Sequence, residues 1–146
     1  MGLNRLMLSK KTTAGGGTVG DNVFIMTMGS KSNEYGYNRN NGNYGEVTGN
    51  VKHDGRAVTL VILSYAGGWL DVAFKEDGVT SGSRNINLNI TPIETGVTVP
   101  LAVGAMSYQG DLVGFYTFLQ RVPSDISSMF TAANVGKKFK IEIVFN

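Results

Sequence analysis

The chain contains no cysteine and few charged residues. Of its 146 residues, 16% are Asp, Glu, Lys or Arg, against about a quarter in an average domain, and there are only three prolines and one histidine. Without cysteine the chain can form neither a disulfide nor a thiolate metal site. The 13 basic and 11 acidic residues leave a net charge of +2. This charge is too small to predict a nucleic-acid or membrane partner.

Long apolar runs are also missing. No stretch approaches the roughly 20 residues that a membrane helix requires. The apolar patch at the N-terminus ends at Ser9-Lys10-Lys11, so it is too short for a secretory signal. We therefore expect neither a signal peptide nor membrane insertion. The length suits a single domain, and a chain of this size buries enough surface to fold without a metal or a disulfide.

The first 20 residues differ from the rest of the chain. Four large apolar side chains lie near the start, and a glycine-rich stretch, 14–20, follows them. Glycine makes such a segment flexible, so the apolar tip either frays in solvent or docks onto another surface. We interpret residues 1–20 as an N-terminal arm or linker and residues 21–146 as one β domain. The candidate docking side chains of the arm are Leu3, Leu6, Met7 and Leu8.

Several segments of residues 21–146 have the pattern of β-strands. Residues 85–91 and 138–145 alternate polar and apolar side chains, which is the period of a half-buried strand. Residues 56–65 form the most apolar run. Asp54-Gly55 and Asp77-Gly78 are hairpin signals between strand-like runs. Seven to nine short strands with frequent turns predict a mainly β, antiparallel, sandwich-like fold.

One short helix is expected at about residues 124–134. Ile126, Met129, Phe130 and Ala133 have the spacing of one helical face. Ser124 is placed as the N-cap, and Asp125 complements the helix dipole. The helix is short, so it must pack on the sheet.

No group of residues has the spacing of a catalytic or metal site. Gly15-x-Gly17-x-x-Gly20 matches a dinucleotide fingerprint, but it follows a basic tail rather than a strand, so we interpret it as linker. His53 has no second histidine or cysteine with which to bind a metal and is expected in a solvated turn. The eleven carboxylates are scattered, and Glu76-Asp77 is interpreted as hairpin chemistry. We expect no enzyme activity, no cofactor and no metal.

Aromatic side chains alternate with glycine and asparagine between residues 34 and 45. Aromatic faces beside amide groups offer a sugar an apolar platform together with donors and acceptors. The same residue types are also ordinary in the turns and half-buried strands of β proteins. The candidate contacts for a glycan or a host receptor are Tyr35, Tyr37, Tyr44 and Trp69.

Five segments follow one another in a distinctive order. They are Tyr35-Gly36-Tyr37, Asn43-Tyr44-Gly45-Glu46-Val47 and residues 58–65, 69–74 and 135–143. This order, over residues 24–146, resembles the small accessory β domains of tail and tail-fibre proteins of tailed bacteriophages. Such domains are non-enzymatic and serve attachment, decoration or receptor contact. Here the domain is joined to an arm of its own, which favours a separate virion component.

The resemblance implies a virion structural protein that is assembled in the host cytoplasm. We expect several copies to assemble through the arm, with other virion proteins and further copies of the chain as partners. A carbohydrate-binding or host-receptor-binding module is the alternative. Nucleic acid is not expected as a partner.

Overall fold

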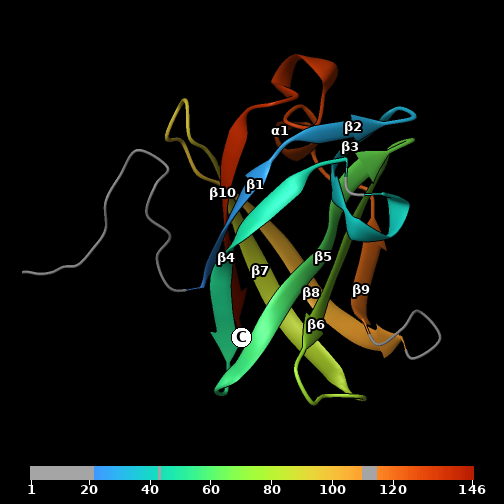
Figure 1. The fold of residues 1–146 in the computed structure, drawn as a ribbon, viewed down its shortest axis with the longest axis vertical. Helices are drawn as coiled ribbons and strands as arrows, with labels where there is room; N and C mark the ends of the chain where they lie inside the picture. The colour runs from blue at the N-terminus through green and yellow to red at the C-terminus, as the bar shows by residue number, and fades with distance from the viewer. Residues whose placement is uncertain (1–21, 43, 110–114) are drawn as a thin grey trace, which may run out of the picture.

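The computed structural model describes residues 22–42, 44–109 and 115–146 as a mainly antiparallel β fold (Figure 1). Its strands are β1 (Val23–Thr27), β2 (Gly29–Lys31), β3 (Glu34–Asn38), β4 (Glu46–His53), β5 (Arg56–Ala66), β6 (Trp69–Glu76), β7 (Ser83–Pro92), β8 (Val99–Gln109), β9 (Phe115–Gln120) and β10 (Lys138–Phe145). Its short helices are η2 (Arg39–Asn41), α1 (Ser124–Ser127) and η4 (Ala132–Asn134). Over the described residues, no helix has the length and apolar character needed to cross a bilayer.

All ten strands belong to one sheet that curls until it meets itself. The strand order is β2-β3-β5-β4-β1-β10-β7-β8-β9-β6, and β6 also pairs with β5. That last ladder closes the sheet (Figure 1). The predicted antiparallel β fold with one short α-helix is confirmed. The facing layers expected of a sandwich are here opposite walls of a single curled sheet.

The interior of the closed sheet is filled with apolar side chains. Alternation along β10 buries Phe139, Ile141 and Ile143, and alternation along β7 buries Ile86 and its inward neighbours. These inward positions join one main cluster that also includes residues of β1, β5, β6, β8 and α1. Each fully buried large apolar side chain contributes about 1.5–3 kcal/mol, so this cluster is the main source of stability for the fold.

The two Asp-Gly pairs have different roles. Asp54 and Gly55 have positive φ angles of 51° and 78° and join β4 to its antiparallel partner β5, which is the predicted hairpin. Asp77 and Gly78 connect β6 to β7, but these two strands pair with other neighbours. The second hairpin prediction was therefore wrong. An Asp-Gly turn reverses the direction of the chain, but it does not determine whether the two strands that it joins pair with each other.

The helix is shorter than its apolar pattern predicted. α1 ends at Ser127, and its N-cap is Pro123 rather than Ser124. Thr131 is extended, with φ −136° and ψ 164°, so residues 132–134 form a separate 3-10 turn. Met129 and Phe130 are nevertheless buried. A short helix followed by a bend already brings the apolar side chains to the core, so the longer helix is not needed.

Glycine is required where the segment before β4 passes close to other strands. A Cβ on Gly29 would collide with the carbonyl oxygen of Tyr44. A Cβ on Gly45 would collide with the carbonyl oxygen of Gly36 and would lie 2.9 Å from that of Thr27. The Gly- and Tyr-rich stretch therefore lets backbone segments stack at a separation that no larger residue permits.

Candidate functional site

A polar group of side chains lies on the outer face of β3, β5 and β6. Ser64 of β5 stands opposite Gly36 of β3 on one side and opposite Asp71 of β6 on the other. The neighbouring positions Leu63 and Val72 point into the core. Because successive side chains of a strand point to opposite faces, Ser64 and Asp71 point outward.

The Glu34 carboxylate is the centre of this group. Ser64 Oγ donates to Glu34 Oε2 at 2.6 Å and Asn38 Nδ2 donates to the same oxygen at 3.2 Å, while Asn41 Nδ2 donates to Oε1 at 3.1 Å. Burial alone would raise the pKa of Glu34, but these hydrogen bonds outweigh it, and the pKa is lowered. Glu34 therefore stays ionised and ties η2 to the sheet.

Two further groups beside Glu34 have raised pKa values. The Tyr44 hydroxyl lies next to Glu34 and Ser64. It is fully buried and makes no hydrogen bond of ordinary geometry to any described residue. Burial, with a contribution from Glu34, raises the pKa of this phenol. Burial and the negative charge of Glu34 raise the pKa of Asp71 to about 6. Asp71 thus loses its proton at a higher pH than an ordinary aspartate does.

Trp69 starts β6 on the same outer face as Asp71, two residues along the strand. Its side chain is 43% exposed, and the Arg121 guanidinium carbon lies 4.8 Å from the ring centroid. A cation at this distance is attracted by the π-face of the indole. This pair forms an exposed surface that offers an apolar face and hydrogen-bond donors, and the partly buried Asp71 lies two residues along the strand.

The structure does not bring the four predicted aromatic contacts together on one exposed platform. Tyr35 and Tyr37 pack against the main core, opposite Tyr65 and Leu63 in the β3–β5 ladder. Tyr44 has a buried hydroxyl, so only Trp69 is well exposed. The arm residues Leu3, Leu6, Met7 and Leu8 lie outside the described residues.

A second polar cluster lies where β4, β6, β7 and β10 end or begin. The Glu76 side chain is completely buried. Arg84 donates to it twice, from Nε to Oε2 at 2.8 Å and from Nη2 to Oε1 at 3.0 Å. His53 Nδ1 lies 3.1 Å from Glu76 Oε1. Burial alone would raise the pKa of Glu76, but the hydrogen bonds and charge of Arg84, with those of His53, lower it.

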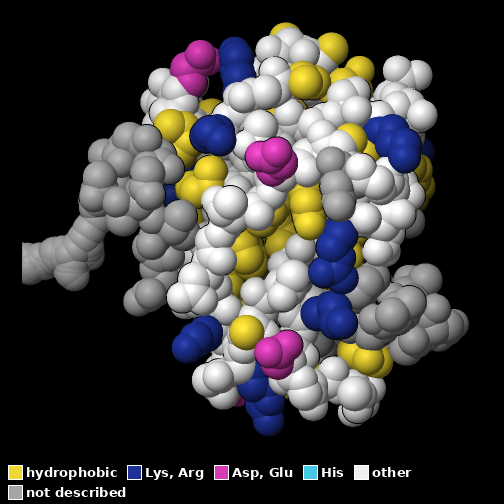
Figure 2. All heavy atoms as spheres, viewed as in Figure 1, with side chains coloured by type: hydrophobic (Ala, Val, Ile, Leu, Met, Phe, Trp, Pro, Cys, Tyr) yellow, Lys and Arg dark blue, Asp and Glu magenta, His cyan; other side chains and the backbone are white. Residues whose placement is uncertain are grey.

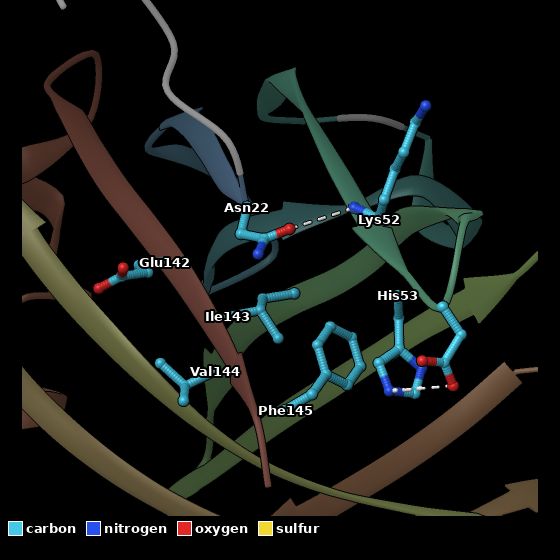
Figure 3. A pocket seen from close by; sticks show the side chains of 8 residues that line it. Asn22, Lys52, His53, Glu142, Ile143, Val144 and Phe145 are labelled. Carbon is cyan, nitrogen blue, oxygen red and sulfur yellow. Dashed lines mark hydrogen bonds and ion pairs between the residues drawn. The ribbon is translucent and has the colours of Figure 1, made fainter. Parts of the chain in front are cut away.

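His53 is not the solvated turn residue that the sequence predicted. Its side chain is only 24% exposed, and its ring stacks on Phe145 with centroids 4.1 Å apart, as Figure 3 shows. Glu76 was likewise predicted to be part of a hairpin turn. Its position continues the inward alternation of Leu70, Val72 and Phe74, and that pattern could have revealed a buried carboxylate in need of partners.

Beside this cluster is an open hollow of about 380 Å³ (Figure 3). The residues that line it are Asn22, Lys52, His53, Asp54, Glu142, Ile143, Val144 and Phe145. None of these carries a hydroxyl or thiol nucleophile, and His53 is held against Glu76. Within the described part of the chain, no three His, Cys, Asp or Glu side chains gather in a way that could hold a metal ion.

Comparison of the chain with known protein families, with characterised proteins and with solved structures gives no match.

Proposed function

We propose that the chain is a non-enzymatic structural protein of a tailed-bacteriophage virion. It assembles in several copies, as a tail, fibre-attachment or decoration component. Residues 1–20 fasten it to neighbouring copies and to other virion proteins. Support comes from the resemblance of residues 24–146 to accessory β domains of phage tails, and from the division of the chain into an apolar arm and a folded domain.

The observation that carries the proposal is the filled interior of the closed sheet. Apolar side chains of β1, β4, β5, β6, β7, β8 and β10 form one main core cluster, and the β5–β6 ladder closes the sheet around it. A core of this extent supports a domain that folds from the described residues. The four large apolar side chains of the arm are then available to a partner, where their burial contributes about 1.5–3 kcal/mol each.

Deletion of residues 1–20 tests this proposal. We expect the truncated chain to keep its β circular-dichroism spectrum and a cooperative unfolding transition, but to lose self-association in light scattering. When expressed during infection with a phage that encodes the full chain, it should also be missing from purified particles. Incorporation at the level of the full chain would contradict the proposal. Replacement of residues 14–17 by four serines, which keeps the apolar tip, is the matched control.

Trp69 and Asp71 support a second candidate, a carbohydrate-binding or host-receptor-binding module. An exposed indole beside a carboxylate and Arg121 supplies the platform and the hydrogen-bonding groups that a sugar needs. On a glycan array, this candidate predicts binding that Trp69→Ala abolishes. Val97→Ala is the control, because Val97 is also exposed, at 64%, but lies in the connection between β7 and β8. Absence of any sugar preference would exclude this candidate.

A further inference from the structure

The strand β1 is shorter than the two strands that flank it. β1 has five residues, whereas β4 and β10 have eight each. Its ladders end at Val23, which lies opposite Asn50 of β4 and Glu142 of β10. Residues 51–53 of β4 and 143–145 of β10 continue past this point, and within the described strands they pair only on their far sides, with β5 and β7. Over this length the sheet lacks a strand between β4 and β10.

The open hollow of Figure 3 lies at this position. Its lining comes from the ends of β4 and β10 and from Asn22, the residue before β1. Two strands that flank a third lie about 10 Å apart, which is the space that one more strand fills. In Figure 3, Asn22 lies at one end of the hollow, and the stacked rings of His53 and Phe145 lie between the two strands. We refer to this opening as the β4–β10 slot.

Asn22 turns the chain out of the slot. Its φ is +61°, in the left-handed region that asparagine tolerates but an extended strand does not use. Its carbonyl accepts from Ile143 N–H at 3.2 Å, and its side-chain oxygen accepts from Lys52 N–H at 3.2 Å. In a regular extension of β1, the carbonyl of Asp21 takes that Lys52 N–H. The Asn22 side chain therefore replaces the backbone of the residue before it.

The β1 ladders, continued into the slot, place a charge pair on the outer face. The existing register puts Asp21 opposite Lys52 of β4 and Val144 of β10. The neighbouring Val51 is buried and Lys52 is exposed, so the Lys52 side chain points outward. An aspartate directly across from a lysine on neighbouring strands is a favourable pair.

The same register places a glycine over the rings on the inner face. Gly20 comes opposite His53 and Phe145. These two rings point towards the interior, where His53 contacts the buried Glu76 and Phe145 contacts the ring of Phe74. A side chain at position 20 would meet the rings, and glycine has none. The residues that precede β1 therefore match the slot in both charge and size.

We propose that residues 19–21, the root of the arm, close the β4–β10 slot as an extension of β1. In the closed state Asn22 is extended, and the Asp21 carbonyl replaces the Asn22 side chain as acceptor for Lys52 N–H. The structure describes the open state. The inference deepens the proposed function and rests on it, since closure sets the direction in which the arm leaves the domain. A closed root directs the arm past the β4–β5 hairpin, along the axis of β1.

The covalent link favours the root of the same chain over a strand from a second copy. Asn22 is already bonded to both flanking strands, through Ile143 N–H and through the Asn50 carbonyl at 3.1 Å. A change at this one residue brings Asp21 into the slot. A segment that is joined to the edge of its site has a high effective concentration there, so a second copy has to compete with it.

Disulfide trapping in the full chain tests the inference, because the chain has no cysteine of its own. The continued register places Val19 opposite Asn146. Asn146 and Lys140 are both exposed and lie three residues to either side of Ile143, to which Asn22 is bonded. A root outside the slot reaches both positions, whereas a root in the slot reaches only Asn146.

The two double variants are therefore a matched pair. Under mild oxidation at low protein concentration, we expect Val19→Cys with Asn146→Cys to give cross-linked monomer at least about tenfold faster than Val19→Cys with Lys140→Cys. Equal rates would overturn the inference. A cross-linked dimer in place of the monomer would also overturn it, because a second copy would then supply the strand.

Substitutions in the root test the register. Gly20→Leu should abolish trapping at position 146, because the new side chain meets the rings, while Gly16→Leu, which lies before the root, should not. Asp21→Lys should slow trapping about two- to fivefold, and Lys52→Asp in the same chain should restore the rate. Trapping that is insensitive to Gly20→Leu would show that the root does not enter the slot. Gly20 and Gly16 lie outside the described fold, and Lys52 is exposed.

The outcomes separate this inference from the proposed function. If deletion of residues 1–20 abolishes assembly but position 146 is trapped no faster than position 140, the proposed function stands and the inference is wrong. If position 146 is trapped preferentially but the truncated chain still enters particles, the root closes the slot and the proposed function fails.

Discussion

Replacement of Arg84 by methionine probes the buried charge cluster most directly. The change keeps much of the side-chain volume but removes both hydrogen bonds to Glu76, whose side chain has no exposed surface. Removing one partner of a buried ion pair costs about 3–5 kcal/mol, since the other charge is left uncompensated. His53 remains 3.1 Å from Glu76, so we expect the lower end, a loss of about 3 kcal/mol at pH 7.

The pH dependence of this loss gives a sharper test than its size. The folded-state pKa of Glu76 is lowered, so its stabilisation in the parent protein is present above the unfolded pKa near 4.5 and is lost as the pH falls through the folded value. In Arg84→Met, the hydrogen bonds and the charge of Arg84 no longer offset the effect of burial on Glu76, so the pKa of Glu76 rises. Acidification then neutralises Glu76 and removes the uncompensated buried charge. The cost of the substitution should therefore be smaller at pH 5 than at pH 7.

Urea denaturation at the two pH values measures both effects. The slope of the free energy against urea should not change, because the same surface is exposed on unfolding. Arg56→Met, at an exposed position of the hairpin, is the control and should cost less than about 0.5 kcal/mol. In the double variant Arg84→Met with Glu76→Leu, the buried charge is gone and much of the stability should return. A loss below about 1 kcal/mol, or an equal loss at both pH values, would refute the reasoning.

Two further predictions concern the outer face. The pKa of Asp71 is raised to about 6. Its negative charge therefore disfavours folding above that pH, and this penalty vanishes as the pH falls towards 3.8, the ordinary value. Asp71→Asn should raise the free energy of unfolding by about 1 kcal/mol at pH 7.5, since the side chain is only partly buried. Equal stabilisation at pH 4 would contradict this. Gly36 has a φ of +125°, and a Cβ there would collide with the Leu63 carbonyl oxygen. Gly36→Ala should therefore lower stability by about 3 kcal/mol or more. Gly78 also has a positive φ, +75°, but open space around it, so Gly78→Ala should cost only about 1 kcal/mol. Thermal melts of the two variants give the comparison. Similar losses would contradict a steric role for the contact between Gly36 and the Leu63 carbonyl.

Local sequence patterns were sufficient to predict the strands β5, β7 and β10 and the inward faces of β7 and β10. The alternation of residues 85–91 and 138–145 depends only on neighbours along the chain, and the structure buries the predicted faces. The Asp54-Gly55 turn was equally predictable, since two positive φ angles and a two-residue connection leave little choice of geometry. The end of the helix was not predictable, because burial of Met129 and Phe130 depends on what packs over them.

The candidate sites depended on contacts between distant residues. Tyr35, Tyr37, Tyr44 and Trp69 look alike in the sequence, yet of these four only Trp69 is well exposed. Glu34 meets Ser64 across 30 residues, and His53 meets Glu76 across 23. The spacing of residues along the chain does not predict such long-range contacts.

The sequence by itself determined a cysteine-free, weakly charged chain of short antiparallel strands with an apolar tip ahead of a glycine-rich tether. The tertiary structure decided that these strands form one closed sheet, which carboxylates are buried, and where β4 parts from β5. The physical reason is range. Side-chain alternation and turn chemistry act over a few residues, whereas strand partnership and the burial of a charge are set by free energy gained only when remote segments meet.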